Sequence, residues 1–245
     1  MKRFLKPANL PFLSLCGGLL TCIMRLWLMI LGQDERGLFA SGSFPDVMSW
    51  ILVAAAMATF ALSTKDMRGG AKYGYNFPVS LPAAIAMVLA AVSFCITSIG
   101  ELATDADTIG TASSVLGFVA AVALVFLALG RYRGFRLNVL FHGSVCLYLM
   151  LYLVSHYRLW SSYPQLQNYG FELLAIVFVM LACYHRAAFD AKCGNRRAYT
   201  FFTSAALFFC LAALPGCENP AFFLGCSVWM YFTPCRLHHA SRREE

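Results

Sequence analysis

The sequence predicts an all-α integral membrane protein: a bundle of about eight transmembrane helices with short loops, and with N-terminus and C-terminus both cytoplasmic. Of the 245 residues, 60% are hydrophobic and only 13% are charged, whereas an average soluble domain is roughly 45 to 50% apolar and about 25% charged. Apolar runs recur along the whole chain, and Lys and Arg gather in alternate loops between them. These observations exclude a water-soluble globule and predict one polytopic domain over residues 1-245.

The spans are predicted from the length that a membrane requires. A spanning helix needs roughly 20 mostly apolar residues, because the hydrocarbon core is about 30 Å thick and a helix rises about 1.5 Å per residue. The last two predicted spans are short, and a turn-forming cluster from Pro215 to Pro220 separates them. Asn219 is the expected N-cap and Pro220 the expected first residue of the eighth helix. The predicted spans are approximately 10-31, 47-63, 79-99, 109-130, 137-157, 169-187, 198-214 and 220-234.

The basic residues predict the orientation. All Lys and Arg residues except Arg25, Arg36 and Arg158 fall in the two termini and in the second, fourth and sixth loops. Loops rich in Lys and Arg stay in the cytoplasm, so this alternation places both termini there. A seven-span arrangement would move Arg236, Arg242 and Arg243 outside, which disfavours it. The opposite side carries most acidic residues: Asp34, Glu35, Asp46, Glu101, Asp105, Asp107 and Glu218.

Charge and loop length restrict the function classes and partners. The net charge of +7 is explained by basic anchors beside an anionic leaflet of the lipid bilayer, so no nucleic acid partner is expected. The loops, at most about 16 residues long, leave no room for a soluble catalytic domain. The outward loops carry no Asn-x-Ser/Thr sequon, which is compatible with a bacterial cytoplasmic (plasma) membrane.

Metal and nucleophile motifs are also missing. The sequence contains no Walker-type loop, GxGxxG, HExxH or GxSxG. The segment from Cys235 to His239 has ligand-type side chains but lacks a partner pair for a closed zinc site, so an interfacial tail is the simpler interpretation. Seven of the ten cysteines fall within predicted spans, where thiols behave as small hydrophobes. We expect no metal, no cofactor and free thiols.

Ionisable residues inside spans are the candidate functional groups, because each costs about 2.5 to 3.5 kcal/mol to insert. Arg25 lies roughly 9 Å from the outer end of the first span. It either snorkels to the outer interface or faces an outward cavity, where it binds an anion or pairs with Glu101 or Glu172. We therefore predict a ligand-binding site formed by Arg25, Glu101, His156 and Glu172.

A proton path is a second candidate. His156 and Glu172 lie near the outer end of the hairpin formed by the fifth and sixth spans, and His142 and His185 lie nearer its cytoplasmic end. Side-to-side pairs at matched depths could relay protons, because His titrates near neutral pH. The simpler alternative places His156, His185 and Glu172 at the headgroup boundary. The residues assigned to the path itself are His142 and His185.

Small residues predict how the first helix packs. Ser14, Gly18 and Cys22 recur at four-residue spacing, which permits close backbone approach to a neighbouring helix. Arg25 lies seven residues beyond Gly18 and hence close to the same face. This stripe would direct Arg25 toward the interior of the bundle, which favours the cavity interpretation.

Three functions compete. The preferred one is a small-solute transporter or permease component with an outward-side polar cavity. The alternative is a non-catalytic sensor or scaffold whose basic cytoplasmic loops bind anionic lipid or a protein partner. The third is a membrane-embedded lipid-modifying enzyme, which would need acidic groups for metal or acid/base chemistry where the cytoplasmic side offers few.

Overall fold

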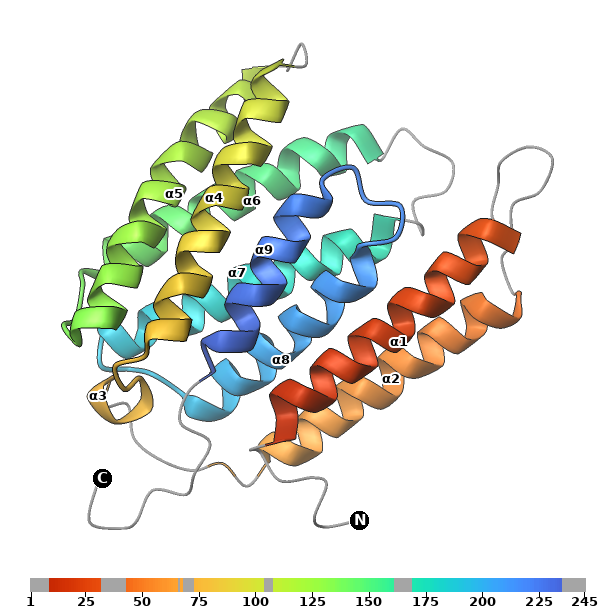
Figure 1. The fold of residues 1–245 in the computed structure, drawn as a ribbon, viewed down its shortest axis with the longest axis horizontal. Coiled ribbons are helices and arrows are strands. Elements are labelled where there is room, and N and C mark those ends of the chain that lie inside the picture. The colour runs from red at the N-terminus through yellow and green to blue at the C-terminus, as the bar shows by residue number, and fades with distance from the viewer. Residues whose placement is uncertain are drawn as a thin grey trace.

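The computed structural model describes residues 9–31, 43–65, 67, 73–103, 108–160 and 169–234. Every regular element in these ranges is a helix (Figure 1). The elements are α1 (Leu10–Leu31), α2 (Phe44–Thr64), α3 (Tyr73–Asn76), α4 (Leu81–Ala103), α5 (Thr108–Arg133), α6 (Val139–Trp160), α7 (Gly170–Asp190), α8 (Arg196–Ala213) and α9 (Pro220–Phe232).

Each predicted segment coincides with one of these helices. Six of them, namely α1, α2, α4, α5, α6 and α7, are long and apolar enough to cross a membrane. The protein is therefore a helical, multi-pass membrane protein. The ends move by a few residues where local chemistry dictates it. For example, α2 begins at Phe44 because Pro45 and Asp46 suit a first turn.

The last two helices, α8 and α9, fall outside this set of six. Helix α9 has 13 residues and rises about 20 Å, which is less than the hydrocarbon thickness. Helix α8 carries two arginines at its start and buries Thr200, Thr203 and Ser204. It packs against α1, α2, α7 and α9, so it has little need of a lipid-compatible surface. Eight spans and the orientation of the termini stay a prediction.

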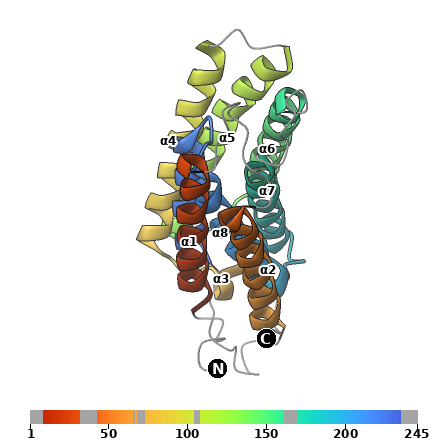
Figure 2. The same ribbon diagram turned by 90° about the vertical axis from the view of Figure 1, so that its right-hand side faces the viewer.

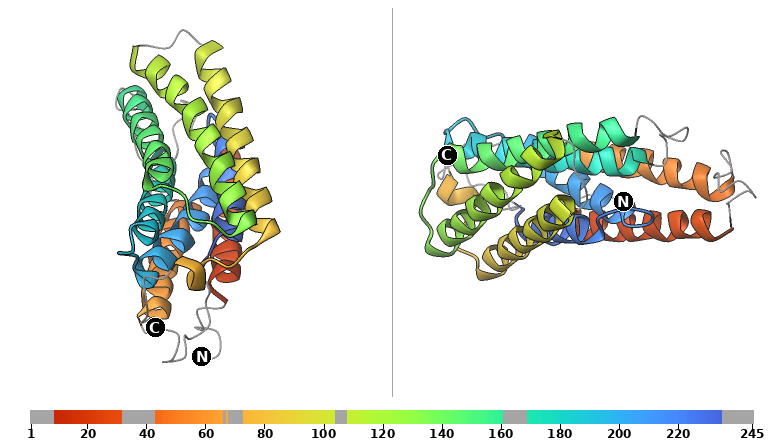
Figure 3. Two further views of the ribbon diagram at one scale, coloured as in Figure 1. Left: turned by 90° about the vertical axis from the view of Figure 1, so that its left-hand side faces the viewer. Right: turned by 90° about the horizontal axis from the view of Figure 1, so that it is seen from above.

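The helices enclose α8. In Figure 2, α1 and α4 lie on one side, α2, α6 and α7 on the other, and α8 lies between them. Seen from above, α5 closes the far edge between α4 and α6 (Figure 3). Helix α1 begins and α9 ends at the same end of the bundle (Figure 1). We call this the inner end and the opposite one the outer end.

The predicted turn between α8 and α9 is present, with a correction to its cap. Gly216 adopts φ +77°, a left-handed conformation that glycine reaches without strain. Asn219 occupies the N-cap position and α9 begins at Pro220, but the Asn219 side chain makes no cap hydrogen bond. Its Nδ2 donates instead to the phenolic oxygen of Tyr152 at 3.3 Å. The Asn219 side chain thus bonds to α6 through its amide nitrogen, whereas an N-cap bond would use its amide oxygen.

The small-residue stripe of α1 packs on α8, in agreement with the prediction from its spacing. The Ser14 hydroxyl donates to the carbonyl oxygen of Ser204 at 2.5 Å. A Cβ on Gly18 would lie 3.0 Å from both the Leu211 Cβ and the Phe208 carbonyl oxygen. Arg25 lies two turns beyond Gly18 and hence on the same face of α1. This face therefore places Arg25 against α8 as well.

Candidate functional site

Arg25 is turned into the bundle, so the snorkelling alternative does not apply. Its side chain is 9% exposed, and its Nη1 donates to the Ala212 carbonyl oxygen at 2.7 Å. Ala212 lies in the last turn of α8, where carbonyls lack partners within the helix and attract cations. The guanidinium carbon stands 4.4 Å from the centre of the Phe171 ring, a cation–π contact. The Phe171 ring also packs against Trp50 of α2, with 5.1 Å between the ring centres.

Glu172 is an acidic residue whose charge acts on Arg25. It is 2% exposed and belongs to the first turn of α7, where the helix dipole favours a carboxylate. Among the described residues, these two side chains are not in direct contact as an ion pair. The structure thus buries Arg25 and Glu172 close enough to interact electrostatically, although their charged groups are not in contact.

A second acid–base pair lies at the same end. His156 of α6 places Nε2 3.7 Å from Glu101 Oε1 of α4, and the Ser114 hydroxyl of α5 donates to Glu101 Oε2 at 3.0 Å. The other ring nitrogen, Nδ1, is 3.0 Å from the Tyr152 carbonyl oxygen. Since a carbonyl can only accept, Nδ1 carries a hydrogen. At 3.7 Å the contact between Nε2 and Oε1 is too long for a hydrogen bond, and the two groups attract each other as an ion pair only when the imidazole is protonated.

Tyr152 connects the two pairs. Its ring stacks on that of His156 at 4.0 Å between centres, and both Glu101 and Glu172 act electrostatically on its hydroxyl. Glu218, exposed in the α8–α9 loop, acts on Glu101, His156 and Glu172. We call the set Arg25, Glu101, Tyr152, His156 and Glu172 the outer polar cluster.

The sequence suggested other partners by depth. It matched His156 with Glu172, but the structure places His156 beside Glu101, a residue of α4. Of the two acidic partners considered for Arg25, Glu172 is the one whose charge acts on it. The four predicted residues lie at the same end of the bundle, with Glu101 beside His156 and with Glu172 acting electrostatically on Arg25. Their role in ligand binding stays a prediction.

The two residues of the predicted proton path are not paired with each other. His142 is 1% exposed, and its Nδ1 lies 3.0 Å from Asp190 Oδ2 at the end of α7. His185 stacks on Phe202 of α8, 4.9 Å between ring centres. Nothing in this geometry joins His142 to His185, and a relay through either residue stays a prediction.

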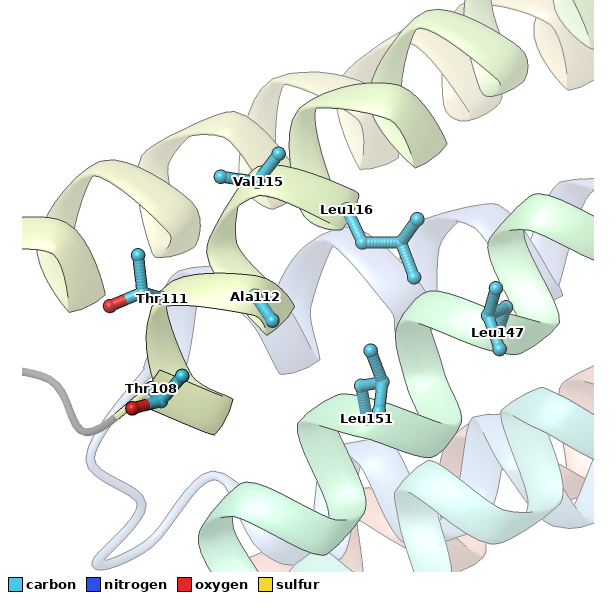
Figure 4. Close-up of a pocket in the computed structure, with 7 residues that line it drawn as sticks. All are labelled: Thr108, Thr111, Ala112, Val115, Leu116, Leu147 and Leu151. Atoms are coloured by element: carbon cyan, nitrogen blue, oxygen red, sulfur yellow. The ribbon is translucent and has the colours of Figure 1, made fainter.

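Two open grooves lie between α5 and α6. The first, about 670 Å³, is lined near the outer end by Thr108, Thr111, Ala112, Val115 and Leu116 of α5 and by Leu147 and Leu151 of α6 (Figure 4). The second, about 650 Å³, lies nearer the inner end. Neither lining contains a residue of the outer polar cluster. Both grooves are predominantly apolar, as a surface against lipid chains requires.

Sequence reasoning missed three residues of this region. Tyr152 and Asp190 were not among the candidate residues, and Asn219 was expected only as a helix cap. A depth argument would not have found Asp190, because it lies about 7.5 Å of helix rise beyond His185, the residue matched in depth with His142.

Some sequence-based predictions concern residues that the structure does not describe. Arg36 and the segment from Cys235 to His239 lie outside the described ranges. Within those ranges, no group of three or more His, Cys, Asp or Glu side chains could hold a metal ion. The nine cysteines there are free, and three of them are fully buried.

The outer polar cluster therefore combines a buried guanidinium, a buried carboxyl group and a histidine–carboxyl pair, contributed by α1, α4, α6 and α7. Such a set can bind a charged group and exchange a proton. A comparison of the chain with known protein families, with curated proteins and with solved structures finds no match.

Proposed function

We propose that the protein is a membrane carrier that moves a small carboxylate-bearing solute together with a proton, with the outer polar cluster as the binding site. The observation that carries the proposal is that Arg25, His156 and Glu172 are buried at one end of the bundle, together with the partly buried Glu101, on four different helices. Ionisable groups within spans of membrane proteins mark solute and proton pathways.

Arg25 is the expected anchor for the solute. A guanidinium binds a carboxylate through two parallel hydrogen bonds, and Phe171 holds its planar face. Arg25 already contacts α7 through Phe171 and α8 through Ala212. A solute held there would link α1 to both helices, which is how binding can change the packing of a bundle.

The proton follows from charge balance. A buried site disfavours net charge, because desolvation weakens the hydration of every ion in it. A carboxylate brings one negative charge to the cluster, and one proton taken up at Glu101–His156 or at Glu172 cancels it. Four of the five described side chains of the cluster are buried, so an added charge there would be poorly hydrated.

Uptake into proteoliposomes tests the proposal. Radiolabelled short-chain carboxylates and amino acids are offered with and without an inward proton gradient. We expect uptake of at least one carboxylate above that of empty liposomes, accelerated by the gradient. An amino acid transported without any gradient dependence would contradict the proton coupling, and no carboxylate uptake under any condition would contradict the carrier itself.

Variants assign the roles. Arg25→Ala should lower uptake at least tenfold and Arg25→Lys less, because lysine keeps the charge but not the planar fork. Glu101→Gln should remove the dependence on the proton gradient. Arg158→Ala is the matched control, because Arg158 is an exposed arginine at the same end. Equal uptake by Arg25→Ala and the wild type would remove Arg25 from the site.

A further inference from the structure

Two arginines are buried at the inner end around one phenylalanine. Arg131, in the last turn of α5, is 4% exposed, and Arg186 of α7 is 2% exposed. Their guanidinium carbons lie 5.3 and 4.5 Å from the centre of the Phe77 ring. Phe77, which follows α3, is itself 3% exposed. We call Arg131, Arg186 and Phe77 the inner cationic site.

Aromatic side chains fix this site from three sides. The Phe77 ring meets Phe189 and Tyr199 edge to face at 5.1 and 5.3 Å, and Tyr73 at 5.2 Å. The Tyr199 hydroxyl donates to the Thr233 carbonyl oxygen at 2.7 Å and also interacts with Arg186. Both guanidinium groups are therefore held against the Phe77 ring and away from water.

Arg186 carries hydrogen-bond donors that the protein does not use. Its Nε and Nη1 are buried and have no hydrogen-bond partner among the residues that the structure describes. Buried donors of a charged group are normally satisfied, and leaving them unsatisfied is strongly destabilising. Arg131 places a second positive charge against the same ring, which makes an anionic group favourable there.

The described acidic residue beside Arg186 faces a different partner, and its Oδ1 makes no hydrogen bond to a described residue. Asp190 acts electrostatically on Arg186, but its Oδ2 lies 3.0 Å from His142 Nδ1. Arg136 lies in the segment between α5 and α6 and donates to the backbone oxygens of Phe189 and Asp190 at 3.0 and 2.6 Å. Arg196 is also buried at this end. Among the described residues here, cations outnumber carboxylates.

We propose that Arg186 and Arg131 bind a phosphate oxyanion at the inner end of the bundle. A phosphate group offers several acceptor oxygens and more than one negative charge, so it can accept from Nε and Nη1 of Arg186 while it faces the second guanidinium. The same group is available from an anionic phospholipid headgroup and from free phosphate. This site is separate from the outer polar cluster and does not depend on carrier activity.

Thermal unfolding of the full-length protein, followed by its tryptophan fluorescence, tests the proposal. The detergent-solubilised protein is titrated with inorganic phosphate against chloride at equal ionic strength. In a second arm, mixed micelles of phosphatidylglycerol are compared with phosphatidylcholine. Binding should raise Tm by about 5 to 10 °C at roughly a hundredfold excess over Kd. A shift with phosphate identifies the free ion as a source, and a shift with phosphatidylglycerol alone identifies the headgroup.

Three variants decide the assignment. Arg186→Gln should abolish the shift, and Arg186→Lys should reduce it while keeping the charge. Arg133→Gln should retain it, because Arg133 is an exposed arginine on the same helix as Arg131. If Arg186→Gln does not fold, Arg131→Gln and Arg186→Lys carry the test. No shift in either arm, or an unchanged shift in the Arg131 and Arg186 variants, overturns the proposal.

Discussion

Asn219 donates to the hydroxyl of Tyr152 across 3.3 Å, and this bond ties the loop between α8 and α9 to α6. Because the Tyr152 ring also stacks on His156 and on Phe222 of α9, at 4.0 and 4.7 Å between centres, one side chain joins the outer polar cluster to the last helix pair. The position of Glu218 relative to that cluster depends on the same link.

Tyr152→Phe should destabilise the protein by about 1 kcal/mol, because it leaves the Asn219 amide without this partner. The expected fall in Tm is about 2 to 4 °C for a chain of this size. Tyr157→Phe is the control: Tyr157 lies near the end of the same helix and is 49% exposed. Equal Tm values for both variants would show that the Tyr152–Asn219 bond contributes nothing to stability.

His142→Leu should be more damaging, by about 3 kcal/mol, because it leaves Asp190 buried without its imidazole partner. Adding Asp190→Asn should recover part of the loss, since the uncompensated carboxylate is then gone. His185→Leu should change Tm little, because His185 is half-buried against Phe202. The three variants are compared by thermal unfolding in detergent. A double variant less stable than His142→Leu would contradict this account.

Gly225→Ala should weaken the contact between α9 and α4. A Cβ at Gly225 would lie 2.6 Å from the Cβ of Ser93 and would also collide with its hydroxyl. We expect a loss of about 1 to 3 kcal/mol from this overpacking. At Gly143 of α6 a Cβ would meet nothing within 4 Å, so Gly143→Ala should leave Tm unchanged or slightly raised. The prediction fails if both alanine variants unfold at the wild-type temperature.

Cys217 should react slowly with maleimides. Burial, followed by the negative charge of Glu172, raises the pKa of its thiol to about 12, and its Sγ contacts the Leu214 carbonyl oxygen at 3.1 Å. Only the thiolate is nucleophilic, so labelling at neutral pH should be on the order of a thousandfold slower than for an ordinary thiol. The labelling rate should rise about tenfold for each unit by which the pH is raised, up to about pH 12. Rapid labelling at pH 7 would contradict this.

Labelling also tests the orientation. Cys193, exposed at the inner end just after α7, should react with a membrane-impermeant maleimide in inverted vesicles and not in intact cells. Cys217 should react only from the outside, at high pH. Cys193→Ser and Cys217→Ser identify each label. Reaction of both thiols from the same side would contradict the arrangement with eight spans.

Hydropathy and charge predicted where the helices lie, because the lengths of apolar runs and the placement of basic residues act locally along the chain. The burial of Arg25 was also predictable, since Ser14 and Gly18 mark the face of α1 that approaches α8. The pairing of His156 with Glu101 was not, because depth along two neighbouring spans says nothing about which third helix stands beside them.

The inner cationic site lay beyond sequence reasoning for a related reason. Arg131 and Arg186 were interpreted as topological anchors at helix ends, and an anchor is expected to face water. Both arginines are covered by the ring of Phe77, the residue that follows the short helix α3. A four-residue helix leaves no periodic pattern to detect. Charge counts predict which side a residue is on, but not what covers it.

The enclosure of α8 by α1, α2, α7 and α9 bears on how the chain is made. Two arginines and several hydroxyl groups make α8 a weak signal for entry into lipid by itself. The more apolar helices that precede it enter the bilayer first and form the space that it fills. During synthesis, the central helix α8 therefore follows three of the four helices that pack around it. We expect a chain that stops before α8 to insert into the membrane without its central helix.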